Sequence, residues 1–422
     1  MTEIVVAGGG LAGLVAARRL AAAGHEVTLY EERAELGGRV RSRDVEGFTC
    51  DRGFQVLFDS YPAVRDELDL NALDLRRFSP GGVICRPGQR STLSDPLREP
   101  TKLLESALNR EITMADKLRT LKLRRRLTSG DWPEFGIPDQ SIRTFLQDEG
   151  FSSGFIDAFA APLYGGITLD RSLATSAHIF EYTFRAMSLG SIGVPAEGMA
   201  AIPAQLAARA RDAGVDVQTG VAVEAVETDG ATVTVETTAG AHDPDAVVVA
   251  TDPQTARDLT AVENIPVEAK SVVTQHYRLP GPALSAGTRI MLNAETQEPN
   301  TVAQLSAVAP EYTSDEDVLL VASFVGDYAQ DIEAADLVTR TQKTLAAWYP
   351  ERGFDGLELL ATDRIPFAQF AQPPGAHATL PDATDPAGPV YLAGDYTRWS
   401  SIQGALESGQ RAAEAAAVGL SD

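Results

Sequence analysis

Hydrophobic residues at the start of the chain predict a strand, a helix and a second strand in close succession. Residues 4–7 form a short apolar run of the kind that is buried on both faces of a sheet. Apolar residues then recur at helical spacing from position 11 to position 20, and Gly24 ends that helix. A second apolar run at 27–30 predicts the next strand, which ends at Glu31. The pattern is that of a βαβ unit, as found in folds of the α/β class.

The loop between the first strand and the helix reads Gly8-Gly9-Gly10-Leu11-Ala12-Gly13 and satisfies the pattern G-x-G-x-x-G. In this setting Gly8 permits a tight turn, Gly10 lets backbone N–H groups approach a pyrophosphate, and Gly13 lets the helix pack on the strand. Glu31 can accept hydrogen bonds from a ribose hydroxyl and would repel a 2′-phosphate. The residues predicted to bind a dinucleotide are therefore Gly8, Gly10, Leu11, Ala12, Gly13 and Glu31.

Later regions of the chain continue the alternation of strands and helices. Residues 203–214 predict a helix, residues 221–236 two alternating strands, and residues 246–251 a buried strand. Near the end of the chain a strand runs into a Gly-Asp pair at 394–395, and a helix whose first turn carries small residues follows from 401. The N-terminus of such a helix would stabilise negative charge on a bound ligand.

Residues 27–39, which end in Gly37-Gly38-Arg39, resemble a stretch of flavin amine oxidases, phytoene desaturases and protoporphyrinogen oxidases in which a ribose-binding Glu precedes Gly-Gly-Arg. Residues 390–409 and 198–251 are similar to two further flavin segments of the same superfamily. The resemblance implies bound FAD, and a guanidinium independently suits a diphosphate through its paired donors. Beyond the glycine loop, the implied FAD contacts are Glu31, Glu32, Gly38, Arg39, Val223, Gly394, Asp395, Ser401, Ile402, Gln403 and Ala405.

The same resemblance implies an α/β fold with a Rossmann-like FAD-binding domain of the glutathione-reductase type and a mixed α+β substrate domain. FAD carries the redox step in such proteins, so the chain has to place a substrate C–H or N–H against the flavin. The FAD-binding domain is expected to be discontinuous and to comprise residues 1–80, 196–255 and 360–422, with 81–195 and 256–359 forming the substrate domain.

Non-covalent FAD is expected from the positions of the cysteines and histidines. No cysteine follows Cys85, and none of the five histidines falls in a flavin motif. The chain also lacks C-x-x-C and H-E-x-x-H, so no metal is expected.

The segments expected to cover the flavin are rich in apolar and aromatic residues. Such spacing is most often that of a packed core, and otherwise that of a pocket for a largely hydrocarbon ligand. No essential acid or base stands out in these segments. If they line a pocket, the side chains expected to contact the substrate are Tyr164, Tyr182, Phe184, Phe367 and Trp399.

Two features of flavin amine oxidases bear on the substrate class. Those enzymes hold a water near flavin N5 with a lysine. In this chain the corresponding position lies in the strand that follows Pro266. Val272 stands there, with Lys270 two residues earlier. Their aromatic cage has a C-terminal position that falls at Ser401. These departures favour a phytoene desaturase-like oxidoreductase with a hydrophobic, isoprenoid-like or carotenoid-like substrate over an amine or protoporphyrinogen oxidase. A non-enzymatic binder of prenyl or lipid groups is a third alternative, against which the set of FAD motifs argues.

Composition bears on the surroundings of the protein and not on its reaction. The 422 residues carry a formal net charge of −23, and only 5 of the 36 basic residues are lysines. This balance speaks against nucleic-acid binding and favours a halophilic protein in a salt-rich cytoplasm, with an ordinary acidic enzyme as the alternative. Two cysteines, a start without a basic leader and the absence of a long apolar run also favour a cytoplasmic protein.

Residues 114–126 are basic within this acidic chain, and Met114, Leu118 and Leu121 give them an apolar stripe. Such a helix is typical of a segment that docks on an anionic membrane. It is also typical of a helix that pairs with the protein's own acidic surface, and we favour this second interpretation. Peripheral membrane contact stays open as the alternative.

Overall fold

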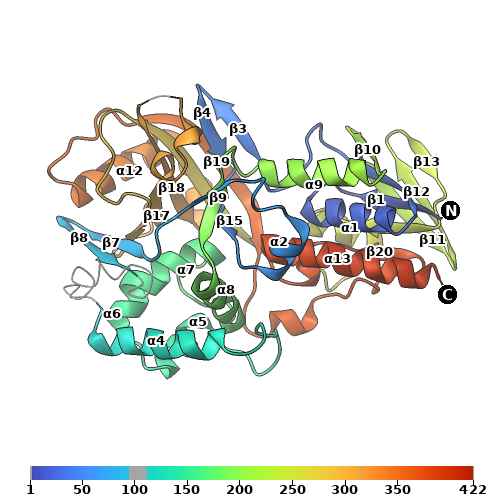
Figure 1. Ribbon diagram of the computed structural model, residues 1–422, viewed down its shortest axis with the longest axis horizontal. Helices are drawn as coiled ribbons and strands as arrows, with labels where there is room; N and C mark the ends of the chain where they lie inside the picture. Colours follow the sequence, from blue (N-terminus) through green and yellow to red (C-terminus); the bar gives the residue numbers. More distant parts are fainter. Residues whose placement is uncertain (1, 95–111, 315, 422) are drawn as a thin grey trace.

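A parallel sheet of five strands forms the centre of one half of the molecule (Figure 1). The computed structural model describes residues 2–94, 112–314 and 316–421. The apolar residues of β1 and β14 are buried, as expected for strands covered on both faces. The strand order is β10-β2-β1-β14-β20, with bounds Asp216–Thr219, Glu26–Glu31, Glu3–Ala7, Ala246–Val249 and Val390–Leu392.

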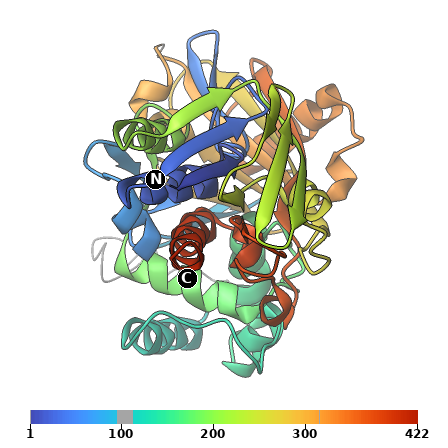
Figure 2. The same cartoon turned by 90° about the vertical axis from the view of Figure 1, so that its right-hand side faces the viewer.

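Helices cover one face of this parallel sheet, and a smaller antiparallel sheet covers the other. The central helix α1 connects β1 to β2 and packs against both α9 and α13. Both termini of the chain lie at this end of the molecule (Figure 2). The helices are α1 (Leu11–Ala22), α9 (Ala201–Asp212) and α13 (Ile402–Gly419). The opposite face carries β11 (Val223–Asp229), β12 (Thr232–Thr237), β13 (Gly240–His242) and α10 (Pro253–Thr260).

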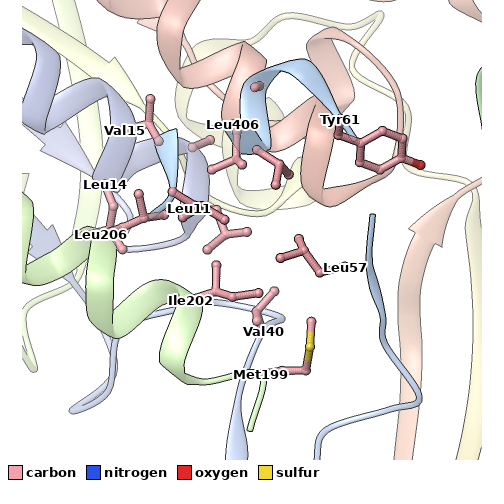
Figure 3. Close-up of a cluster of buried hydrophobic side chains, with 14 of the residues drawn as sticks. Leu11, Leu14, Val15, Val40, Leu57, Tyr61, Met199, Ile202, Leu206 and Leu406 are labelled. Atoms are coloured by element: carbon pink, nitrogen blue, oxygen red, sulfur yellow. The ribbon is translucent and has the colours of Figure 1, made fainter. Parts of the chain in front are cut away.

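The core beneath the three helices ties together segments from both ends of the chain (Figure 3). Leu14 of α1, Ile202 of α9 and Leu406 of α13 are fully buried in it. Burial of each such side chain contributes about 1.5–3 kcal/mol, so this core holds the glycine loop and the C-terminal helix in a fixed relation. Tyr61 lies at the edge of the cluster, and its hydroxyl is directed away from the other side chains.

A mixed sheet of seven strands organises the other half. Its neighbouring strands are antiparallel except for β16 and β7. One face packs against α12 (Ala334–Trp348), and the other meets the hairpin of β3 (Ser42–Val45) and β4 (Phe48–Asp51). The order is β19-β15-β18-β17-β16-β7-β8, with bounds Glu358–Phe370, Ala269–Leu279, Val318–Val325, Thr301–Gln304, Ile290–Asn293, Gly82–Arg86 and Gln89–Leu93.

The long strand β19 corrects one predicted boundary. The sequence prediction starts the last FAD-binding segment at residue 360, but β19 pairs with β15 in the seven-stranded sheet as far as Phe370. Strand pairing is decided by contacts with residues far away in the sequence, and no turn signal at 360 marks a change of sheet. The last segment therefore leaves the second sheet only after Phe370.

Helices from residues 114–189 form a third packing unit below the seven-stranded sheet in Figure 1. Phe145, Phe155 and Phe180 form the buried centre of this unit. None of the helices in the described ranges is long and apolar enough to cross a membrane. The unit contains α4 (Met114–Thr128), α5 (Ile142–Asp148), α6 (Ser153–Phe155), α7 (Ala161–Thr168) and α8 (Ala177–Leu189). Between the halves lie α2 (Pro62–Glu67) and a small sheet of β5 (Leu57–Phe58), β9 (Ile192–Pro195) and β6 (Leu75–Arg77).

Candidate functional site

A cavity of about 680 Å³ extends from the glycine loop to the seven-stranded sheet. Its walls include Gly8 and Gly10 at one end, and Ile179 of α8, Val272 of β15 and Val325 of β18 at the other. Cavities of ~300–1,000 Å³ between packed layers are the usual size of ligand sites. The cavity is therefore our candidate functional site.

The glycine loop leaves the first turn of α1 open to this cavity. Gly8 has a φ of +111°, and a Cβ there would lie 2.6 Å from the carbonyl oxygen of Ala250. A Cβ on Gly13 would lie 2.0 Å from the carbonyl oxygen of Gly8, so Gly13 is required for packing and does not itself line the cavity. Gly10 is the N-cap, and no side chain caps the helix. The free N–H groups of this turn suit an anion such as a diphosphate.

Glu31 is fixed at the end of β2 by the backbone of its neighbours. Its Oε2 accepts a hydrogen bond from the N–H of Gly9 at 2.7 Å, and its Oε1 accepts one from the N–H of Arg33 at 3.1 Å. The carboxylate is 6% exposed and lies in the cavity wall, as does its more exposed neighbour Glu32. Each carboxylate oxygen can accept a second hydrogen bond, so Glu31 can also hold a ribose hydroxyl.

Arg39 joins the N-terminal motif to the C-terminal one. Its Nη2 donates to Oδ1 of Asp395 at 2.7 Å, and Oδ2 of Asp395 accepts from Oγ of Ser400 at 2.8 Å. Arg39 lies deep in the protein but has 35% of its side chain accessible because it faces the cavity. Burial opposes the charge of Arg39, but the ion pair with Asp395 outweighs burial and raises the pKa of Arg39. Arg39 is thus a fixed cation in the wall.

A further arginine makes the same end of the cavity more positive. Burial, followed by the nearby charge of Arg41, lowers the pKa of Arg52, which lines the cavity. Such a shift is typical of a place where like charges gather. With Arg33 and Arg39 also in the wall, this end suits a ligand that carries a diphosphate.

The start of α13 contributes most, but not all, of its predicted residues to the cavity. Gly394, Ser401, Ile402 and Ala405 lie in the wall, and Val223 lies there at the start of β11. Oγ of Ser401 accepts from the N–H of Gly404 at 2.8 Å and so caps the helix. Gln403 is a correction to the prediction, because it turns away from the cavity on the opposite side of the helix. It is 2% exposed, and its Oε1 accepts from the N–H of Ala63 at 2.9 Å.

Of the five aromatic residues predicted to meet a substrate, Phe367 and Trp399 line the cavity. Nε1 of Trp399 is buried without a hydrogen-bond partner among the described residues. The other three are corrections, because they lie on other faces of α7 and α8 than the wall does. Tyr164 packs on Phe180 (ring centroids 4.6 Å apart), Tyr182 on Trp132 (4.7 Å) and Phe184 on Phe180 (5.5 Å).

The face of α8 that does line the cavity carries residues that the sequence prediction missed. Ile179, Thr183 and Met187 lie in the wall at intervals of four residues. This i, i+4 spacing places three side chains on one face of a helix and is visible in the sequence. Nothing local in the sequence shows which face of α8 is turned to the cavity.

The two residues of β15 that bear on amine chemistry differ in whether they line the cavity. Val272 lies in the cavity wall and is 6% exposed. Lys270 does not line the cavity, and its Nζ lies 3.4 Å from Oδ2 of Asp170. No three His, Cys, Asp or Glu residues in the described ranges come together as a metal site would require.

Charge is confined to one end of the cavity. Every charged side chain in the described wall comes from residues 31–52, from Asp252 or from Asp395. The wall residues contributed by 163–192 and by 272–325 are uncharged, and most are aliphatic. The cavity can therefore hold an anionic dinucleotide at one end and an apolar molecule at the other.

Comparisons with known proteins agree with this arrangement. The model of the family described as flavin containing amine oxidoreductase matches residues 11–417. A phytoene dehydrogenase of Streptomyces griseus is 30% identical over 281 residues, which are 59% of this chain and 54% of that protein. The chain thus matches about half the length of that relative. A 4,4′-diapophytoene desaturase from Staphylococcus haemolyticus is 46% identical over a shorter stretch, which is 15% of this chain and 13% of that protein.

Solved structures share the fold at low sequence identity. Cyclohexylamine oxidase from Brevibacterium oxydans superposes with a TM-score of 0.72, at 18% identity and with 100% of both chains covered. An oxidoreductase from Methanosarcina mazei gives a TM-score of 0.74, at 18% identity, with 98% of this chain and 100% of that chain covered. The predicted fold class, a Rossmann-like domain joined to a mixed substrate domain, is confirmed.

Proposed function

The chain belongs to the flavin-containing amine oxidoreductase family, and on that premise we propose that it binds FAD non-covalently and oxidises a hydrophobic, isoprenoid-like substrate. As a flavin-dependent oxidoreductase it uses a cofactor that accepts a hydride from a substrate and passes the electrons on. The work of the chain is to hold that cofactor, to orient the substrate and to exclude water. The confinement of charge to one end of the cavity is the observation that carries the proposal.

The residues of the polar end would hold FAD in the following way. The N–H groups of the first turn of α1, beside Gly10, would bind the diphosphate together with Arg39. Glu31 would accept from the ribose of the adenosine. The N-terminus of α13, capped by Ser401, would place its positive end beside the flavin ring.

Non-covalent attachment is supported by the composition of the wall. Neither cysteine and none of the five histidines lines the cavity. Cys50 is buried, which raises the pKa of its thiol to about 12, so it is not a reactive nucleophile at neutral pH. Gentle denaturation should therefore release the flavin into solution.

The apolar end supports a hydrocarbon substrate. Its wall includes Leu163, Ile167, Ile290 and Ile365, and its described residues offer no cation or anion to hold a charged amine. Val272 lies in the wall, and by the resemblance to amine oxidases it stands at the position of their lysine. The phytoene dehydrogenase and diapophytoene desaturase among the relatives agree with this substrate class. Amine oxidation is the second candidate, because cyclohexylamine oxidase shares the fold.

Anaerobic flavin bleaching in high salt tests this proposal. The purified protein is mixed with an isoprenoid-lipid extract or with a panel of primary amines and polyamines, and loss of the oxidised flavin band is followed. We expect bleaching by the lipid extract only. Bleaching by amines only would overturn the substrate class, and a colourless protein that takes up no added FAD would overturn the cofactor. Bound flavin that no donor reduces would contradict an oxidoreductase.

One side of α4 pairs with the protein's own acidic residues, as favoured from the sequence, since Nη1 of Arg126 lies 2.5 Å from Oε1 of Glu149. For the exposed side of α4 we further propose contact with an anionic lipid surface. Met114 and Leu118 are each 64% exposed, and Leu121, Lys122 and Arg125 are exposed on the same face. Contiguous apolar and basic side chains in a chain of net charge −23 match the chemistry of such a surface.

Vesicle flotation tests this surface. The double change Met114→Glu and Leu118→Glu should abolish binding to anionic vesicles, because it places two negative charges on the docking face. Val418→Glu is the matched control, because Val418 is also 64% exposed but lies on α13. Equal flotation of both variants would contradict the proposal.

A further inference from the structure

One row of polar side chains crosses the seven-stranded sheet on the face that meets the cavity. Thr301 of β17 is paired with Ser323 of β18, Ser323 with Thr274 of β15, and Thr274 with Asp363 of β19. Side chains of directly paired residues lie on one face with their Cβ atoms about 4.5–5.5 Å apart. Nη1 of Arg43 then donates to Oδ1 of Asp363 at 2.7 Å. We call these five residues the polar row.

The polar row begins in the cavity and ends at the surface. Thr301 and Ser323 lie in the cavity wall. Thr274 is fully buried and Asp363 is 7% exposed, whereas 41% of the side chain of Arg43 is exposed. The row is thus a continuous line of hydroxyl, carboxylate and guanidinium groups that passes through the interior of the protein.

The residues around the polar row on the same face of the seven-stranded sheet are apolar. On β18, the residues two positions to either side of Ser323 are Val321 and Val325, and on β17 the next residue on this face is Ala303. His276, two residues beyond Thr274 on β15, is the exception, and it is fully buried beside Asp363 and Arg43. A polar line through an apolar face needs a reason, because buried polar groups are favourable only when they are hydrogen-bonded.

Four polar atoms in the polar row and on the neighbouring His276 have no hydrogen-bond partner among the described residues. They are Oγ1 of Thr274, Oδ2 of Asp363, and Nδ1 and Nε2 of His276. Native proteins leave few buried polar atoms unpaired, and groups of them commonly bind internal water, which makes two to four hydrogen bonds. The arrangement therefore suits water molecules that bridge Thr274, His276 and Asp363.

Resting on the proposed function, we propose that the polar row and its bound water conduct protons between the cavity and solvent. When a –CH₂–CH₂– unit becomes a double bond, one hydrogen leaves as a hydride with both electrons to the flavin, and the other leaves as a proton. That proton passes from water at Ser323 past Thr274 to the carboxylate of Asp363, and from there to solvent beside Arg43. The flavin is the oxidant, so the step balances in atoms and electrons.

The competing explanation is purely structural. In that case the ion pair of Arg43 and Asp363 only clamps β3 to β19, and the hydroxyl of Thr274 has no role. Thr274→Val separates the two explanations, because it removes that hydroxyl at nearly constant volume and leaves the ion pair in place. Thr341→Val is the matched control, since Thr341 is also fully buried and its hydroxyl accepts from Tyr277 on the opposite face of the same sheet.

Two measurements test the row without any substrate. In the first, bound flavin is photoreduced with a deazaflavin dye in lightly buffered solution, and a pH indicator follows the uptake of protons that reduction requires. We expect proton uptake in Thr274→Val to be slower by at least about tenfold, as for loss of a proton-transfer group, with wild-type rates in Thr341→Val and in the rescuing variant Thr274→Ser. Equal rates in Thr274→Val and Thr341→Val would overturn the proposal.

The second measurement is a high-resolution crystal structure, which needs neither substrate nor flavin. We expect water within hydrogen-bonding distance of Oγ1 of Thr274 and Oδ2 of Asp363, and its loss in Thr274→Val. A dry row would overturn the proton path even if the protein oxidises lipids. Conversely, a colourless protein with a hydrated row would contradict the proposed function and leave the water site in place.

Discussion

The two ends of the cavity are built in different ways. The polar end is made largely of backbone: the glycine loop, the first turn of α1 and the start of α13. The apolar end is made of side chains from α7, α8 and five strands of the seven-stranded sheet. A backbone site demands particular residues at fixed spacing, whereas a side-chain wall demands only apolar volume.

This difference explains what each end can tolerate. A methyl group added at Gly13 meets a carbonyl that cannot move without shifting a strand. A changed aliphatic residue in the apolar wall alters shape by one or two carbons and leaves the fold intact. The polar end should therefore respond to substitution in an all-or-none manner, and the apolar end should respond gradually.

The largest effect is expected from Gly13→Ala. Its Cβ would lie 2.0 Å from the carbonyl oxygen of Gly8, so we expect a loss of about 4 kcal/mol or more in the free energy of unfolding, together with loss of flavin. Gly10→Ala is the informative partner, because a Cβ there meets no atom within 4 Å and its φ is −74°.

Chemical denaturation with and without added FAD distinguishes these two variants. We expect Gly10→Ala to keep the stability of the apoprotein and to lose flavin affinity, because its methyl group would occupy the proposed place of the diphosphate. If Gly10→Ala bound flavin as tightly as the wild type, the first turn of α1 would not be the diphosphate site.

The next largest effect is a loss of stability at low pH, and it is expected from His276 in the seven-stranded sheet. Burial, opposed by Asp363 and reinforced by Arg43, lowers the pKa of His276 to about 4. Between that value and about 6.5 the unfolded chain binds a proton that the folded protein does not, so stability falls as the pH falls through this window. The expected loss from His276 is about 3 kcal/mol. His276→Leu should flatten the dependence measured by urea denaturation at several pH values.

His25→Leu, in the turn before β2, is the control for this measurement. His377 also lowers the stability of the folded protein as the pH falls, because burial lowers its pKa to about 4. A pH profile of His276→Leu that matched the wild type would show that folding does not lower the pKa of His276, and it would contradict this prediction.

The contrast between the two ends of the cavity also explains which residues could be predicted from the sequence. Gly8, Gly10, Glu31 and Arg39 could be named because the motif that carries them is local in sequence and demanded by backbone geometry. Tyr182 was misplaced because the pattern of α8 has two apolar faces, and only tertiary packing decides which one meets the cavity.

The seven-stranded sheet was harder to predict from the sequence for a related reason. Its strands pair across long separations, so β19 could be recognised as a strand but not assigned to a sheet. The polar row was invisible for the same cause, since Thr301, Ser323, Thr274 and Asp363 become neighbours only through strand register.

A moderate effect is expected from Glu31→Ala. Its carboxylate holds the N–H groups of Gly9 and Arg33 and would hold the ribose, so we expect flavin affinity to fall by about 2 kcal/mol, which is roughly 30-fold. The measurement is fluorescence titration of the apoprotein with FAD. Glu32→Ala serves as the control, because 63% of its side chain is exposed and its contact with Arg33 is 3.5 Å long. Equal losses in both variants would mean that the ribose lies between them.

The smallest effect is expected from Lys270→Met, at the border between the apolar wall and the surface. Lys270 faces Asp170 and not the cavity, so the rate of flavin bleaching by isoprenoid lipid should change by no more than about twofold. The reciprocal variant Val272→Lys places an ammonium in the apolar wall and should slow the same reaction strongly, because a buried charge without a partner is unfavourable. Stopped-flow absorbance of the flavin measures both. If Lys270→Met abolished bleaching while flavin affinity stayed unchanged, the lysine would reach the reacting atoms in solution, and the amine-oxidase interpretation of the apolar end would replace ours.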